Sequence, residues 1–462
     1  MRNNHYRSAT HLRVLLTDSR YFVSSLVALL CLLCSGAVGR AQSLNYELRD
    51  CIERGLQNNY QLQIVRNQEQ MARNNATWAN AGALPTLDAT AALRPTYHNF
   101  EQSTARATDE VTENDNVLDY TLDASASLSW TLFDGFKIQT NHRQLKLLEQ
   151  QGETATRMAV EDLIADITSE YYNYIQQIIR RAHYRYALSL SRERLRIAEL
   201  NYQTGRFSGL DYHQARVDFH SDSSAYVRQR EVVHASRIRL NTLMANHDVN
   251  QRIVVPDSSI RVRDDLLLES LWQQTLDANA SLINAAQNTM LAEQDLRKVQ
   301  SRNYPYLRLN TQYGYTANHY DIYSTRERET LGFTGGLTLG INLWDGNRRR
   351  ERRNAELGIQ NRQLQRQQLE LELHARLTTF WMSYRNNLDL LQLQRENLEI
   401  AENNLEIAME RYKLGNLSGF DMRQVQKALL DAEERVLQVE FDAKLCEISL
   451  LLISGGISWY LE

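Results

Sequence analysis

The stretch from residue 412 to residue 421 reads Tyr-Lys-Leu-Gly-Asn-Leu-Ser-Gly-Phe-Asp, and residues 202–211 almost copy it as Tyr-Gln-Thr-Gly-Arg-Phe-Ser-Gly-Leu-Asp. Each stretch lies between two long runs without proline, which is typical of the turn in a helical hairpin. Gly205 and Gly415 can adopt the left-handed conformation that ends a helix. The repeated turn therefore predicts a repeated architecture.

The second half of each stretch predicts the start of the next helix. Ser208 and Ser418 are suitable N-cap residues, and Asp211 and Asp421 follow three positions later. This spacing gives a capping box, in which serine and aspartate satisfy backbone N–H groups and the carboxylate faces the positive end of the helix dipole.

Residues 1–41 have the order of a secretory signal peptide. Five arginines against Asp18 precede or flank an apolar run from Phe22 to Leu33, and small residues lead to a cleavage site after Ala41. An uncleaved anchor is the alternative, although the apolar run is only marginally long enough to span a bilayer. We therefore expect an exported protein.

The remaining composition excludes some classes of protein. The whole chain has a net charge of −4, and removal of the signal peptide makes it more negative, so nucleic-acid binding is not expected. Two cysteines remain, Cys51 and Cys446. They could pair in an oxidising compartment if the two ends of the chain meet, or they could be unpaired, packed thiols.

Two pairs of segments alternate between apolar and small polar residues, the pattern of β-strands. In the first half they cover about 86–97 and 119–132, with a polar loop between them, and in the second half about 306–317 and 330–344. Pro85 and Pro305 precede the two pairs. After each pair, a run of about 65 residues without proline predicts a helix on the order of 100 Å long.

The resulting fold class is mainly α-helical with a transmembrane β part, duplicated within the chain. We assign the first structural repeat to 42–254, a linker to 255–264 and the second repeat to 265–462, with tip turns at 203–210 and 413–420. Each repeat is expected to run as helix, strand hairpin, long helix, turn and helix.

The strands match transmembrane β-strands in length and alternation, with a soluble sheet packed on helices as the alternative. Four strands cannot close a barrel, so the chain must form oligomers. Two copies would give a barrel filled by side chains, whereas three would leave a channel, which suits the polar face. The helices are too long and too polar for lipid and should extend into the periplasm as a helical tunnel.

These features, in this order and present twice, resemble the TolC-like outer-membrane efflux proteins over nearly the whole mature chain. The matching segments are Asn58-Asn59, Ala83-Leu84-Pro85, Leu132-Phe133-Asp134-Gly135, Leu343-Trp344-Asp345-Gly346-Asn347-Arg348 and the two Tyr-x-x-Gly turns. The resemblance implies a homotrimer with a twelve-stranded barrel in the outer membrane of a Gram-negative bacterium. It also implies a periplasmic α-barrel, a periplasmic adaptor (membrane fusion) protein and an inner-membrane transporter as partners.

The resemblance places both turns at the periplasmic tip, where the adaptor docks and the tunnel narrows. The implied docking residues are Tyr202, Gly205, Ser208, Gly209, Tyr412, Gly415, Ser418 and Gly419. Asp421 and Asp211 are candidates for the pore constriction, with helix capping as the alternative role. The sequence departs from some members of the family at Gln424 and Gln214, where those members have a second acidic residue, and at Leu417, which is not an arginine.

The function expected from this organisation is an exit duct that passively conducts drugs, metals or other toxic compounds. The same channel serving type I protein secretion is an alternative, and a non-conducting periplasmic coiled-coil adaptor is a further one. No enzyme, metal site or cofactor is expected, because the glycine-rich segment at 332–340 falls within a strand and no catalytic motif is present.

Overall fold

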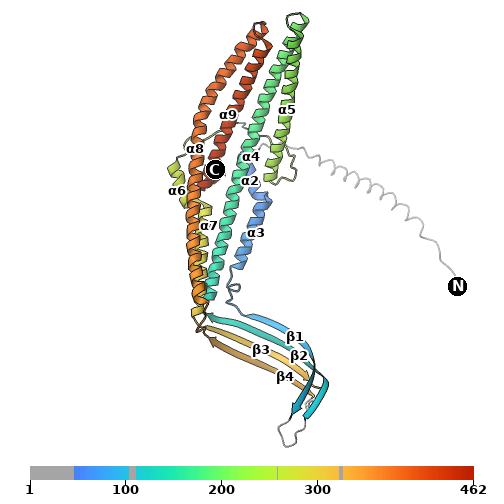
Figure 1. Cartoon of the computed structure of the whole chain (residues 1–462), viewed down its shortest axis with the longest axis vertical. Coiled ribbons are helices and arrows are strands. Elements are labelled where there is room, and N and C mark those ends of the chain that lie inside the picture. The colour runs from blue at the N-terminus through green and yellow to red at the C-terminus, as the bar shows by residue number, and fades with distance from the viewer. Residues whose placement is uncertain (1–45, 104–110, 257–258, 322–325, 462) are drawn as a thin grey trace, which may run out of the picture.

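A computed structural model describes residues 46–103, 111–256, 259–321 and 326–461 of the chain. The expected signal peptide, residues 1–41, lies outside these residues. The molecule is elongated, with a β-sheet at one end and two helical hairpins that point away from it (Figure 1). The sequence turns at 203–210 and 413–420 lie at the far ends of these hairpins.

The two halves of the chain contain the same elements in the same order. The first half has α2 (Leu48–Asn58), α3 (Tyr60–Asn75), β1 (Thr86–Ser103), β2 (Val111–Asp134), α4 (Lys137–Gln203) and α5 (Gly209–Leu243). The second half has α6 (Leu268–Ala278), α7 (Ala280–Gln300), η1 (Ser301–Asn303), β3 (Tyr306–His319), β4 (Glu327–Gly340), α8 (Arg348–Lys413), α9 (Gly419–Ser454) and η2 (Ile457–Leu461). The predicted fold class, mainly helical and internally duplicated, is confirmed.

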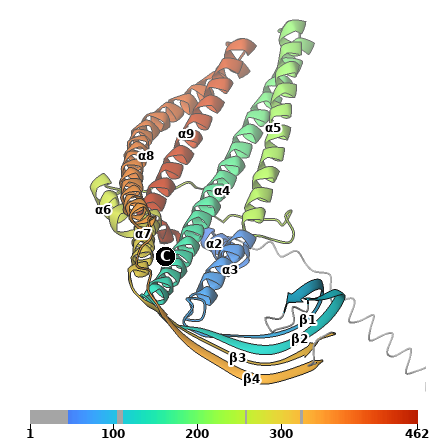
Figure 2. The ribbon, with the colours of Figure 1, turned by 60° about the horizontal axis from the view of Figure 1, so that its bottom comes forward.

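The four strands form one antiparallel sheet in the order β1-β2-β3-β4, so the pairing of β2 with β3 joins the two halves. Its register keeps the two faces chemically distinct. Ala89, Ala126, Tyr313 and Phe333 form one row across all four strands, and the neighbouring row on the other face is Thr90, Ser125, Gly314 and Gly332. The sheet is curved (Figure 2).

The strands differ in length from those expected. Residues 98–118 were expected to form a polar loop, but β1 and β2 continue pairing into this segment as far as Ser103 and Val111. Backbone hydrogen bonds between the two strands sustain the ladder there. In contrast, β4 ends at Gly340 instead of 344, because Gly340 pairs with the first residue of β3, Tyr306, and later residues have no partner strand.

The sheet is incomplete within one chain. The outer edges of β1 and β4 pair with no other strand among the described residues. Large apolar side chains of the apolar face, including Leu87, Leu93, Phe333 and Leu339, are exposed. Unpaired strand edges and an exposed apolar face both require a partner surface.

The helices of both halves break at equivalent asparagines. Asn59 accepts a hydrogen bond from the backbone N–H of Leu62 and donates one to the carbonyl of Leu243. Asn279 does the same with Leu282 and Ile453. Each asparagine thus caps one short helix and holds it against the end of the returning helix of its own half.

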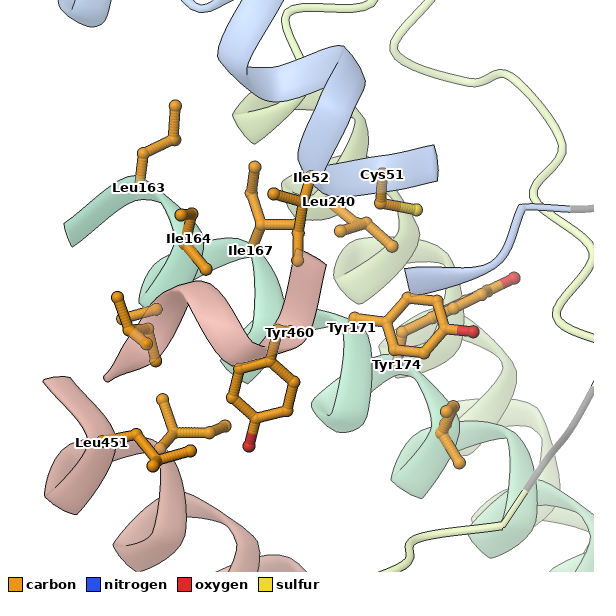
Figure 3. Packing of buried hydrophobic residues seen from close by; sticks show 14 of the residues in the cluster. Cys51, Ile52, Leu163, Ile164, Ile167, Tyr171, Tyr174, Leu240, Leu451 and Tyr460 are labelled. Carbon is orange, nitrogen blue, oxygen red and sulfur yellow. The ribbon is translucent and has the colours of Figure 1, made fainter. Parts of the chain in front are cut away.

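The main hydrophobic core lies midway along the helices, where α4 packs against α2 and the last residues of the chain (Figure 3). Ile167 of α4 and Ile52 of α2 are fully buried there, close to Tyr460 of η2. The Tyr460 hydroxyl donates a 2.8 Å hydrogen bond to Glu447, which also forms a buried 2.7 Å ion pair with Lys444. These bonds fix the end of the chain to α9.

Cys51 and Cys446 are both buried, and both are free thiols, so the disulfide considered as one alternative is not formed. Burial raises the pKa of Cys51 to about 12, which keeps the thiol protonated and unreactive. Within the described segments, none of the helices combines the length and the apolar character that crossing a bilayer requires.

Candidate functional site

The two tip turns, residues 202–211 and 412–421, have the same backbone geometry. Gly205 and Gly415 lie in the left-handed region, with φ of 71° and 77°. The Gly205 N–H donates to the carbonyl of Tyr202, and the Gly415 N–H donates to that of Tyr412, both at 3.0 Å. No atom lies within 4 Å of where a Cβ would be added at either glycine, so the conformation, and not crowding, requires glycine there.

The predicted serine caps are present at both turns. The Ser208 oxygen accepts from the N–H of Asp211 at 3.3 Å, and the Ser418 oxygen accepts from the N–H of Asp421 at 3.0 Å. Each serine hydroxyl also donates to the following aspartate at 2.7 Å. Both aspartates therefore take part in helix capping. Gly209 and Gly419 are the first residues of the helices that follow, α5 and α9.

The two tyrosines that begin these turns have different surroundings. Tyr202 is 47% exposed and stacks on Tyr212 of its own hairpin, with ring centroids 5.5 Å apart. Tyr412 is 1% exposed and packs against Phe207 of the other tip turn. Burial raises the pKa of Tyr412, so its phenol stays neutral. Only the second tyrosine lies between the two hairpins.

Sequence reasoning missed a group of charged side chains that connects the hairpins just behind the tips. We call Arg194, Asp218, Asp222 and Arg423 the interhairpin ion cluster. Arg194 of α4 pairs with Asp218 of α5 and reaches the carbonyl of Gly419 at the start of α9. Burial lowers the pKa of Arg194, and the Asp218 charge opposes this shift.

The second ion pair of the cluster spans the hairpins directly. Arg423 of α9 donates to both carboxylate oxygens of Asp222 of α5, at 2.7 and 2.8 Å. Ser191 of α4 donates to the same carboxylate. Position 417 of the tip is a leucine and therefore cannot form a charged link. Arg194 and Arg423 supply charged links between the hairpins instead.

The cluster occupies positions at which the two repeats differ. With the tip turns superimposed, Arg194 corresponds to Asn404, and Asp218 and Asp222 correspond to Ala428 and Ala432. A position-by-position comparison of the repeats would have drawn attention to these residues. Their pairing could not be predicted, because Arg423 and Asp222 are 201 residues apart in the chain.

An acidic cavity of about 590 Å³ lies between the hairpins, lined by residues of α4, α8 and α9. Its carboxylates are Glu402, Glu406, Glu410 and Glu433. Burial, together with the neighbouring Glu402 and Glu434, raises the pKa of Glu433 to about 7. The cavity thus places a carboxylate that titrates near neutral pH between the two hairpins.

Both tips expose large apolar side chains among polar ones. Leu210 and Phe420 occupy equivalent positions in the first turn of α5 and α9, and they are 75% and 71% exposed. Leu414, beside the second turn glycine, is also exposed. Exposed apolar side chains at the ends of long helices are suited to contact with another protein.

Comparison with known proteins identifies the family. The family model described as outer membrane efflux protein matches residues 51–246 and 271–456, which cover most of both repeats. The pyoverdine export outer membrane protein OpmQ of Pseudomonas aeruginosa is 23% identical over 429 residues, covering 89% of this chain and 85% of OpmQ.

Solved structures share the fold at low sequence identity. The outer membrane protein VceC of Vibrio cholerae has a TM-score of 0.68 and 18% identity, covering 88% of this chain and 96% of VceC. The CmeC outer membrane channel of Campylobacter jejuni has a TM-score of 0.70 and 16% identity, covering 88% of this chain and 85% of CmeC. Because the family model matches more than half of this chain, including most of both repeats, the chain belongs to the outer membrane efflux protein family.

Proposed function

We propose that three copies of this chain form the outer-membrane exit duct of a tripartite efflux system. The duct conducts small molecules passively from a periplasmic adaptor and an inner-membrane transporter to the exterior. Four strands from each copy complete a twelve-stranded barrel, and the helices continue it as a tunnel across the periplasm. Outer-membrane location and efflux follow from the family, while the trimer and the docking residues are our proposal.

The open sheet carries this proposal. Both of its edges are unpaired among the described residues, and its apolar face is exposed. Lipid offers no hydrogen-bond partners, so the edges must pair with those of other copies. Three copies leave room for a channel lined by the small polar face, whereas two would not.

The length of the helices favours a continuous duct and argues against a barrel without a periplasmic extension. α4 and α8 contain 67 and 66 residues, so each is about 100 Å long at 1.5 Å per residue. Both begin within a few residues of a strand, after β2 and β4. A non-conducting adaptor would have no use for strands with a lipid-facing side, which argues against that alternative.

We assign adaptor docking to the tips. Exposed Leu210 and Phe420 extend the predicted docking set of Tyr202, Gly205, Ser208, Gly209, Tyr412, Gly415, Ser418 and Gly419. Tyr412 is buried, so its contribution is to hold the second turn in place and not to contact the adaptor directly. A relative named for pyoverdine export supports a small-molecule cargo.

We further propose that Asp421 faces the pore at the tip while it caps α9. Asp211 accepts the same serine hydroxyl bond and also the backbone N–H of Ser208, so it serves as a control for loss of the capping role. In planar bilayers, the purified protein should conduct ions, and Asp421→Asn should lower its preference for cations more than Asp211→Asn does. A protein that inserts but never conducts would contradict the duct, and equal effects of the two variants would leave capping as the role of both aspartates.

A further inference from the structure

The long helices meet the sheet at the level where β2 and β4 end (Figure 1). Basic residues are concentrated in the sequence of the segments that meet at this level. The sequence Arg348-Arg349-Arg350-Glu351-Arg352-Arg353 opens α8. We call the whole group the basic collar, which consists of Lys137, Arg143, Arg297, Lys298, Arg302, Arg348, Arg349, Arg350, Arg352 and Arg353. The collar lies at the boundary between the apolar sheet and the polar helices.

The collar breaks a local rule of helix stability. The N-terminus of a helix carries partial positive charge and favours acidic side chains. In α8 the first turn has a single acidic residue, Glu351, among arginines, and α4 begins with Lys137 and has no acidic residue in its first turn. At α4 the chain supplies one carboxylate, because Asp134 accepts from the N–H of Ile138 at 3.0 Å. The remaining excess of positive charge near the two helix starts favours binding of an anion from outside the chain.

The chain neutralises only part of this charge. Glu351 pairs with Arg302, and Glu356 pairs with Arg352, both on the surface. Five further arginines of the collar form no ion pair with any described residue: Arg143, Arg297, Arg349, Arg350 and Arg353. The Nε atom of Arg348 is buried and has no hydrogen-bond partner in the described part of the chain.

Three of the arginines surround one cavity. Arg143 of α4, Arg297 of α7 and Arg352 of α8 line a space of about 490 Å³ together with Phe136 and Tyr304. The two aromatic rings meet edge to face with centroids 5.7 Å apart, and both are about half exposed. Guanidinium groups beside exposed aromatic rings match the boundary between phosphate headgroups and acyl chains.

The wall of this cavity is held in a constrained conformation. Gly135 has φ of 69°, and an added Cβ would lie 2.2 Å from the carbonyl oxygen of Ser301. Phe136 has φ of 70°, a left-handed conformation that a bulky side chain rarely adopts. The turn thus keeps Phe136 beside the arginines at a cost in backbone strain.

We propose that the cavity and the basic collar bind the phosphodiester headgroup of an anionic phospholipid in the periplasm-facing leaflet. The collar follows directly after strands whose apolar face suits lipid, and aromatic side chains mark the headgroup level. Arginine binds phosphate oxygens through paired N–H groups, and the cavity offers three arginines from three helices. The inference depends on outer-membrane location and not on the cargo or on conduction.

Thermal unfolding of the purified, assembled protein in a neutral detergent tests the inference. Dioleoylphosphatidylglycerol, dioleoylphosphatidylcholine and inorganic phosphate are added separately at equal phosphate concentration. The variant Arg143→Gln/Arg297→Gln/Arg352→Gln removes the three cavity arginines. The control Arg366→Gln/Arg376→Gln/Arg385→Gln removes the same charge from exposed positions of α8, about 27 Å or more along the helix from Arg348.

Phosphatidylglycerol should raise the unfolding temperature of the wild type and of the control, and the rise should fall by at least half in the cavity variant. An equal rise in all three proteins would overturn the proposal, as would an equal response to phosphatidylcholine. An equal response to inorganic phosphate would show a site for free anions instead. If the triple variant does not assemble, Arg297→Gln alone, at an exposed position, should still reduce the rise, and no reduction would count against the site.

Discussion

The two tip turns share a sequence motif and a backbone, yet only the second has a buried tyrosine. Gly205 and Gly415 have nearly the same φ, and the oxygens of Ser208 and Ser418 both accept from the N–H three residues later. Only the first tip completes the capping box, because the Ser208 N–H also donates to Asp211 at 3.1 Å. Tyr202 is nevertheless exposed, whereas Tyr412 is enclosed between the hairpins. The motif therefore determines the shape of each turn, and packing against the other hairpin determines how firmly that turn is held.

Tyr412 is buried in an apolar cluster with Ile197, Met422 and Leu429, and the interhairpin ion cluster adds charged links between the hairpins. Arg194 reaches the start of α9, and Arg423 of α9 reaches Asp222 of α5, so both links hold the second tip against the first hairpin. The corresponding residues of the other repeat, Asn404 and His213, do not carry the same charge pattern. The two turns are therefore similar in sequence and backbone but unequal in the contacts behind them.

Of the changes considered, removal of Arg194 should most strongly weaken the hold on the second tip. Arg194→Ala leaves the carboxylate of Asp218 largely buried without its partner, which costs about 3–5 kcal/mol. We expect a large fall in the unfolding temperature of the assembled protein and faster proteolysis at the second tip. Arg196→Ala is the matched control, because Arg196 lies on the same helix, is exposed and pairs only within its own turn. Equal stability of the two variants would contradict the role of the cluster.

The tyrosines give the next largest contrast. Tyr412→Ala removes a buried ring and should destabilise the protein by about 3 kcal/mol, as large-to-small changes in a core do. Tyr202→Ala removes an exposed ring and should cost much less. Chemical unfolding of the two variants side by side measures the difference. If Tyr202→Ala were as damaging as Tyr412→Ala, the tips would not differ in the way described.

The stability of the protein should depend on pH through Glu433. The corresponding residue of the first repeat is Ser223, which does not titrate. The folded-state pKa of about 7 lies above the ordinary value of 4.5, so the folded protein holds this proton more tightly than the unfolded chain does. The resulting stabilisation is complete below pH 4.5 and is lost as the pH rises through 7.

Glu433→Gln removes the titrating carboxylate, so the variant should not lose this stabilisation as the pH rises. The variant should be more stable than the wild type at pH 8, by about 1–2 kcal/mol once solvent screening is allowed for, and the difference should vanish near pH 4. Unfolding temperatures between pH 4 and pH 8 provide the measurement, with the exposed Glu399→Gln as control. A difference that does not depend on pH would show that Glu433 is not the titrating group.

The smallest expected effect on stability comes from the serine N-caps, which both tips have. Ser208→Ala and Ser418→Ala each remove one N-cap, and each should cost about 1 kcal/mol. Because the oxygen of each serine accepts the same N–H bond, the two alanine variants should agree closely in chemical unfolding. Ser→Thr at either position should restore most of the stability. A clear inequality between the two alanine variants would show that packing also acts on the caps.

Local patterns allowed the main features of the fold to be predicted. The caps at Ser208 and Ser418 and the turn glycines follow from spacing within ten residues, and the two faces of the sheet follow from alternation. The strand ends were less predictable. Pairing partners, such as Tyr306 for Gly340, decide where a strand stops, and the sequence of one strand does not contain that information.

The candidate site was predicted as a location but not as a set of contacts. The two turns connect α4 to α5 and α8 to α9, and their role as a docking site stays a prediction. The ion cluster was missed because its members come from three helices. The burial of Tyr412 was also not predictable, since Tyr202 has the same local sequence context. Interactions between distant segments remained beyond the reach of pattern and spacing.

The central claim is that identical copies close the open sheet. The mass of the assembled protein tests this claim most directly. The protein is extracted from outer membranes in mild detergent and analysed by native mass spectrometry. We predict a complex of three processed chains that separates into monomers only when the protein unfolds. A monomer that stays folded in the detergent extract, with the edges of β1 and β4 unpaired, would contradict the account.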